Sequence, residues 1–138
     1  MGSLAGIAAT QDSTDIPAIT NAVCVGSGVV ANAVASASIP ALRGSVAYMS
    51  GFQIFAAGAT AASVVTVTIA GLAGGTLSFP FVFPAGATTT AQPIAVSFYP
   101  AAQASGPNAA ITLSVPAGGA GNTAASAQIQ GFYVLSQA

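Results

Sequence analysis

Residues 63–83, SVVTVTIAGLAGGTLSFPFVF, carry the pattern that decides the fold. Threonine alternates with β-branched residues in VTVTI, and phenylalanine occupies every second position of FPFVF. Because successive side chains of a strand point to opposite faces, these patterns predict strands at 63–72 and 76–83, separated by the turn residues AGG. Pro80 lies inside the second strand and has no backbone N–H to donate. The sequence therefore predicts that this strand lies at a sheet edge or contains a bulge.

The rest of the chain repeats the pattern of short strands separated by turns. Strands are predicted at 45–55, 63–72, 76–83, 93–99, 110–115 and 127–135. Clusters rich in glycine, proline and alanine separate them, including the segment 100–109. Strand-like sequence begins earlier, at 18–25, and 28–40 is weakly patterned, with a short helix as the alternative. This spacing predicts an all-β fold, a β-sandwich or jelly-roll-like antiparallel domain.

Alternation also predicts which side chains form the core, since residues two apart share a face of the sheet. The predicted core consists of Val65, Val67, Ile69, Leu77, Phe79, Phe81, Phe83, Ile94, Val96, Phe98, Ile111, Leu113 and Val115. An internal similarity joins SGFQI at 50–54 to QGFYV at 130–134. It has two explanations: a coincidence of common strand residues, or neighbouring strands that use Gly51 and Gly131 as matched bends.

The chain is 138 residues long, enough for one domain. We divide it into an extended N-terminal arm with the first weak strands, 1–40, and a β-sandwich domain, 41–138. The first residues contain neither a basic segment nor an apolar segment of the secretory kind, so no signal peptide is expected.

Charge is nearly absent from the chain. Charged residues make up 2% of it, against roughly 25% in ordinary soluble domains, and they are Asp12, Asp15 and Arg43 alone. Nucleic-acid binding needs clustered Lys and Arg, so this class is excluded, as is a polybasic membrane-binding patch. The most apolar stretch is broken by four glycines and alternates like a strand, so a membrane-spanning helix is not expected either.

The same composition provides few side chains that are suited to catalysis. The chain has no histidine, glutamate or lysine, so it offers no general base that titrates near neutral pH. A single cysteine without histidine does not complete a tetrahedral zinc site. We therefore expect a protein that is not an enzyme and that binds neither a cofactor nor a metal.

The few chemically distinctive residues have simple explanations. Cys24, without a base to ionise it, is predicted to be a small core residue. Asp12 and Asp15 are expected to form turns by bonding nearby backbone N–H groups. Arg43 has two explanations: an ion pair with one of these carboxylates, or a solvent-facing position at the start of a strand.

Residues 45–135 resemble a group of small virion proteins of tailed bacteriophages, the capsid decoration (cement) and head-fibre proteins. The resemblance is carried by the order of GATAAS, VTVTI, VSFYP and AGNTAA. It implies a compact β-sandwich that forms a homodimer or homotrimer and binds the major capsid protein on the outside of the virion. The candidate lattice or oligomer contacts are Leu4, Ile7, Asp12, Asp15 and Arg43.

Three other functions fit the composition. A tail-fibre or head-fibre module that binds the host surface would share the fold, although the chain has no tryptophan and only three tyrosines. An ice-binding protein would need a regular threonine array, and TVT at 66–68 does not recur at a fixed period. A surface-layer or pilus-like subunit is the third alternative.

Overall fold

The structure, a computed structural model, describes residues 22–86 and 94–136. The described residues form eight strands joined by turns and loops, with no helix among them. The strands are β1 (Ala22–Gly26), β2 (Ala35–Ile39), β3 (Ser45–Ala57), β4 (Ser63–Leu72), β5 (Gly75–Phe83), β6 (Ile94–Pro107), β7 (Ile111–Val115) and β8 (Ala124–Leu135). The all-β fold predicted from the alternating pattern is therefore confirmed.

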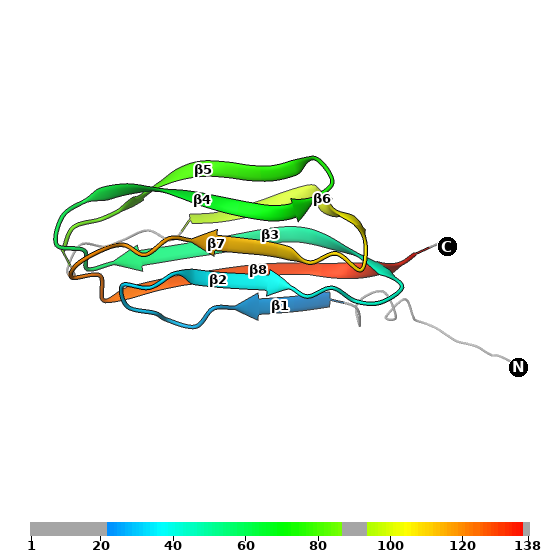
Figure 1. Ribbon diagram of the computed structural model, residues 1–138, viewed down its shortest axis with the longest axis horizontal. Helices are drawn as coiled ribbons and strands as arrows, with labels where there is room; N and C mark the ends of the chain where they lie inside the picture. Colours follow the sequence, from blue (N-terminus) through cyan, green and yellow to red (C-terminus); the bar gives the residue numbers. More distant parts are fainter. Residues whose placement is uncertain (1–21, 87–93, 137–138) are drawn as a thin grey trace, which may run out of the picture.

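The strands make two antiparallel sheets that lie face to face (Figure 1). The first sheet has the order β1-β8-β3-β6, and the second sheet has the order β2-β7-β4-β5. A single residue pair, Leu72 with Ala104, links β4 to β6. In both sheets, strands from the two ends of the sequence lie side by side: β1 pairs with β8, and β2 pairs with β7. This is the strand order of an eight-stranded jelly roll.

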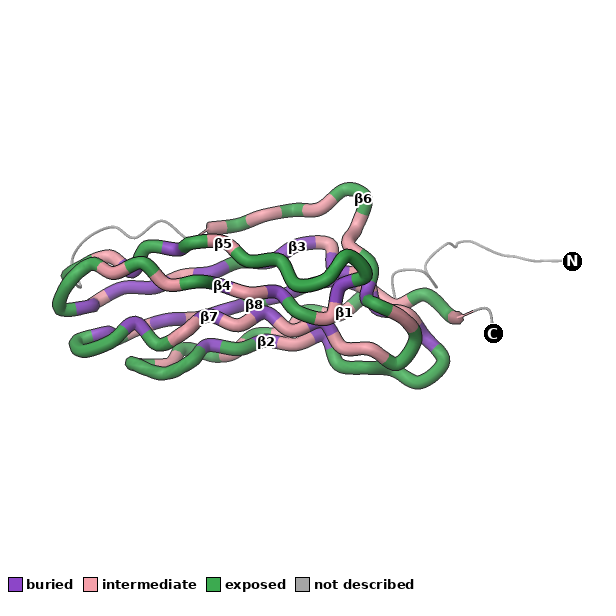
Figure 2. The backbone as a smooth tube through the Cα atoms, turned by 45° about the horizontal axis from the view of Figure 1, so that its top comes forward, coloured by how far each residue is buried: buried purple, intermediate pink, exposed green. Residues whose placement is uncertain are grey.

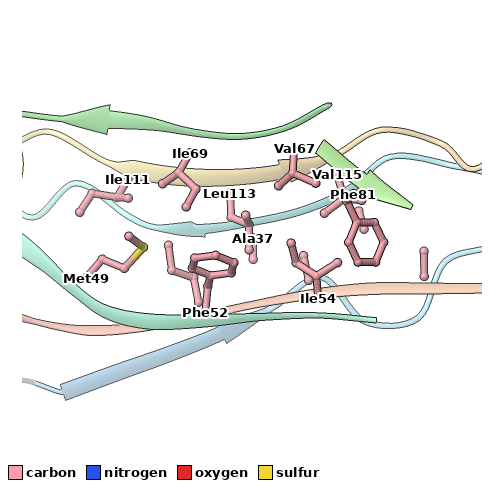
Figure 3. Close-up of a cluster of buried hydrophobic side chains, with 14 of the residues drawn as sticks. Ala37, Met49, Phe52, Ile54, Val67, Ile69, Phe81, Ile111, Leu113 and Val115 are labelled. Carbon is pink, nitrogen blue, oxygen red and sulfur yellow. The ribbon is translucent and has the colours of Figure 1, made fainter. Parts of the chain in front are cut away.

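The core lies between the sheets. Figure 3 shows Val67, Ile69 and Leu113 of the second sheet pointing toward Met49, Phe52 and Ile54 of β3. The largest fully buried side chains are Phe83, Ile39, Met49, Ile54, Ile69, Ile111, Leu113, Ile129, Val67 and Val115. Six of them belong to the predicted set of core residues on β4, β5 and β7, because alternation correctly identified the inward face of those strands.

The similarity between residues 50–54 and 130–134 reflects neighbouring strands. β3 pairs with β8, and the register shifts between Met49 and Gly51, opposite Gly131 and Gln130. A side chain at position 131 would overlap the carbonyl oxygen of Tyr48, and one at position 51 would come within 2.7 Å of the carbonyl oxygen of Val96. The two glycines therefore permit close backbone approach at the same bend.

Two predictions about strand boundaries are wrong. The segment 100–109 was expected to be a turn, but β6 continues through it to Pro107 and pairs again with β3 at Gln103 and Ala102. The residues between Ser97 and Ala102 form a bulge, which absorbs the proline at position 100 without ending the strand. The segment 28–40 was predicted to be a weakly patterned strand, with a short helix as the alternative, but only residues 35–39 of it form a strand.

Loops at one end of the sandwich are joined by Asn122, which is buried. Its Nδ2 donates to the carbonyl oxygens of Ala57 (2.9 Å) and Ala124 (3.1 Å), and its Oδ1 accepts from the backbone N–H of Asn32 (2.8 Å). Asn32 has a φ of 46°, a left-handed conformation that asparagine tolerates better than most residues. This network positions the loops that precede β2, β4 and β8.

Candidate functional site

Most of the residues that were predicted to contact the capsid lattice or another subunit lie outside the part of the chain that the structure describes. Leu4, Ile7, Asp12 and Asp15 lie outside the described residues. Arg43 is exposed in the turn that precedes β3. Its ion pair with a carboxylate therefore stays a prediction, while its position just before a strand agrees with the second explanation.

The described residues contain no group of three or more side chains of the metal-binding kinds His, Cys, Asp and Glu. Cys24 is exposed on β1, so the prediction that it packs in the core is wrong. It alternates with half-buried Val23 and Val25, and β1 is too short and too close to the sheet edge for both of its faces to be covered. Among the same residues, no helix has the length and apolar character needed to cross a membrane.

An apolar cleft of about 290 Å³ lies between the two sheets, at the side where β5 and β6 form their edges. We call it the β5–β6 cleft. Its lining is entirely apolar and consists of Phe52, Ile69, Leu77, Phe79, Ile94, Val96 and Phe98. The ring of Phe52 lies at its base, with ring centroids 5.7 Å from Phe79 and 6.1 Å from Phe98.

Five residues of the predicted core line this cleft and are only partly buried. Leu77 keeps 45% of its surface exposed, and Phe79, Ile94, Val96 and Phe98 are half-buried. Figure 2 shows the corresponding part of β6 as alternating half-buried and exposed residues, with no fully buried position. Alternation correctly predicted that these side chains face inward, but within the described residues nothing closes the sandwich over them.

A second hollow, of about 260 Å³, lies on the outer face of the first sheet. Gln53 of β3 and Gln128 of β8 are paired across the strands, and Phe55 is paired with Ser126 next to them. Gly26 of β1 faces Gln128 and leaves room beside its amide. The hollow thus combines two exposed carboxamides, one hydroxyl and one aromatic ring. We call it the glutamine groove.

The outer face of the second sheet carries rows of hydroxyl groups beside two exposed valines, Val64 and Val82, which are paired across β4 and β5. In register across β2, β7, β4 and β5 lie Ser36, Ser114, Thr68 and Ser78. A neighbouring row contains Ser38 and Thr112, whose hydroxyl oxygens are 3.0 Å apart and hydrogen-bonded. The face carries no charged residue, so its polarity comes from hydroxyl and backbone groups.

Tyr133 joins the two sheets at the end where the described chain begins and ends. Its phenol donates a hydrogen bond of 2.6 Å to the carbonyl oxygen of Pro40, which follows β2. Burial raises the pKa of the Tyr133 phenol above its ordinary value. The group thus acts as a neutral hydrogen-bond donor in the folded chain.

Sequence reasoning found the side chains of the β5–β6 cleft but assigned them to a closed core. It missed the glutamine groove altogether, because the residues of the groove are far apart in sequence and meet only through the pairing of β3 with β8. Comparison with models of known protein families finds no match, and no curated protein matches the chain.

Proposed function

We propose that this chain is a non-enzymatic structural protein of a bacteriophage virion, one that binds the outer surface of the capsid lattice and stabilises it. Its partners in this role are the major capsid protein and further copies of itself. The observation that carries the proposal is the jelly-roll strand order together with an almost uncharged sequence.

The fold supports this role because jelly rolls of two four-stranded sheets form many viral capsid domains. Such a domain is a stiff body with two broad faces, and here these faces carry hydroxyl, amide and apolar groups. Because the chain has a formal net charge of −1, copies crowded on a shell would repel one another very little. A decoration protein requires stable packing between neighbours rather than catalysis.

Purified virions of the phage that encodes the chain provide the first test, by mass spectrometry of their proteins. We expect the chain in many copies per particle. The exposed thiol of Cys24 allows a fluorescent label to be attached for co-sedimentation with shells that lack the protein. Bound protein should raise the temperature at which the shells release DNA, whereas absence of the chain from virions would refute the proposal.

The glutamine groove supports a second candidate function, recognition of a neutral glycan on the host surface. Carboxamides both donate and accept hydrogen bonds and so match the hydroxyl groups of a sugar, while the ring of Phe55 offers an apolar surface. Lectin domains also use the jelly-roll fold.

A glycan array distinguishes this candidate from the first. If the groove binds a sugar, the double variant Gln53→Ala/Gln128→Ala should lose the signal. The matched control Gln130→Ala should keep it, because Gln130 is also an exposed glutamine on β8 but does not line the groove. Absence of any signal from the unmodified chain would eliminate glycan binding and leave the capsid proposal intact.

A further inference from the structure

We infer that a second copy of this chain closes the β5–β6 cleft, through antiparallel pairing of β6 with β6 of the second copy around a two-fold axis. The inference does not depend on the proposed function, since it concerns an interface between identical chains wherever the protein resides.

The first step is the exposed edge of β6. In the segment 94–99, IAVSFY, residues 94–97 pair with β3 on one side, and no described strand pairs with them on the other side. This segment contains no proline, glycine or charged residue and is rich in β-branched and aromatic residues. Natural edge strands often carry charges or prolines that prevent pairing; residues 94–97 lack both, and the bulge at Pro100 limits a further ladder to this part of β6.

The second step is the contrast with β5, the other edge of the cleft. Pro80 lies in the middle of β5, opposite Thr66 of β4. Because proline has no N–H, it interrupts any ladder that a further strand would form along β5. The cleft therefore admits an additional strand along β6 only.

The third step is the identity of that strand. In a two-fold contact each residue approaches its own kind or a near neighbour, so charged residues along the edge would repel. Arg43 is the only charged side chain among the described residues, and it lies in the turn between β2 and β3, away from the cleft. The β6 edge therefore fits a second copy of itself.

One such contact covers both clefts together. With β6 next to its counterpart, Ile94, Val96 and Phe98 of each copy would face the same residues of the other across the joined edges. The first sheets of the two copies would merge into one sheet of eight strands. An interface of six residues per chain is at the small end of interface sizes, so we expect a reversible dimer whose population rises with concentration.

Cross-linking tests the geometry in the full-length chain. Cys24 is first replaced by serine, and then Ala95 and Ser97 are both replaced by cysteine; both are exposed positions of the β6 edge. With Val96 on the two-fold axis, Ala95 of one copy lies opposite Ser97 of the other, and directly opposed residues of paired strands have Cβ atoms about 4.5–5.5 Å apart, near the span of a disulfide. The double variant Ala95→Cys/Ser97→Cys should form a covalent dimer under mild oxidation, whereas the control Ser78→Cys, exposed on the outer face of β5, should not.

Light scattering over a range of concentrations tests the interface itself. Val96→Asp should weaken the dimer by about tenfold or more, which corresponds to about 1.4 kcal/mol, because it brings two carboxylates into an apolar contact. The control Val82→Asp lies on the outer face of β5, where 56% of the valine is exposed, and should dimerise normally. Circular dichroism establishes that both variants are folded.

Three results would overturn the inference. The unmodified chain could remain a monomer at every concentration, or a dimer could form without cross-linking of the double variant at β6. The third is loss of the dimer in the variant Leu4→Asp/Ile7→Asp, which would assign the contact to the N-terminal segment instead of the β6 edge. None of these results bears on capsid binding, which is measured on shells.

Discussion

The backbone N–H of Asn32 donates a 2.8 Å hydrogen bond to Oδ1 of Asn122, across 90 residues of sequence. In the opposite direction, the N–H of Gly119 donates to Oδ1 of Asn32 at 3.0 Å. The two asparagines thereby fasten the loop before β2 to the loop before β8. Asn122 is itself buried, as is its bond to the carbonyl oxygen of Ala57, so solvent does not replace its amide there.

Replacement of Asn122 by alanine should therefore destabilise the fold strongly. It removes three hydrogen bonds, to the carbonyl oxygens of Ala57 and Ala124 and from the N–H of Asn32, of which the first is buried. The carbonyl oxygen of Ala57 keeps the longer 3.3 Å bond from the N–H of Thr123, and each hydrogen bond lost contributes about 0.5–1.5 kcal/mol. We expect a loss of at least about 2 kcal/mol in the free energy of unfolding, measured by urea denaturation. Gln128→Ala, an exposed amide on β8, is the control and should change stability by less than about 0.5 kcal/mol. A loss no larger for Asn122→Ala than for this control would contradict the role of the network.

Gly131→Ala should be among the most damaging single substitutions. The added methyl group would overlap the carbonyl oxygen of Tyr48 and lie within 2.9 Å of the Cδ1 of Ile39. Overpacking typically costs about 1–3 kcal/mol, and here the obstacle is backbone of the neighbouring strand. Gly106→Ala is the control, since no atom lies within 4 Å of a side chain placed there. Equal midpoints of thermal unfolding for the two variants would contradict the close packing of β3 on β8.

Stability should fall in alkaline solution through Tyr133. Its phenol has a raised pKa in the folded chain because of burial, so the folded state binds this proton more tightly than the unfolded state. The resulting stabilisation is complete below the ordinary tyrosine pKa of about 10 and is lost as pH rises through the higher folded value. Urea denaturation between pH 8 and pH 12 measures this loss. Tyr133→Phe keeps the ring, and it should be less stable than the unmodified chain at pH 8 and show a smaller decline above pH 10. An equal decline in both proteins would assign the effect to other groups.

Cys24 should react with a water-soluble thiol reagent while the chain is folded. It is exposed on an edge strand, so no unfolding is required for access. We expect complete labelling at a rate that does not change when denaturant is added below the unfolding transition. Labelling that begins only within the transition would place the thiol in the interior, in contradiction to the structure.

The sequence predicted the fold well where alternation was clear. Val67, Ile69 and Leu113 are fully buried as expected, because the two-residue period of a strand specifies its inward face. The prediction for Cys24 failed because it was made from the chemistry of the thiol and not from alternation, which places Cys24 on the face opposite to half-buried Val23 and Val25.

The candidate sites depended on contacts that no local pattern records. Leu77 and Phe98 were correctly assigned to the inward face, but their exposure depends on the separation of β5 from β6 at the open edges of the two sheets. Likewise, Gln53 and Gln128 become neighbours only through the register of β3 with β8. Pro100 illustrates a third limit, because proline usually ends a strand, whereas here a bulge accommodates it within β6.

The hydroxyl rows on the second sheet bear on how such a chain remains dissolved. Serine and threonine hydroxyls bind water without attracting counterions, and they do not titrate in the ordinary range of pH. A protein hydrated in this way gains little from the electrostatic repulsion that keeps most proteins dispersed, and it loses equally little when salt screens that repulsion. Its solubility should therefore depend little on the screening of charge by salt.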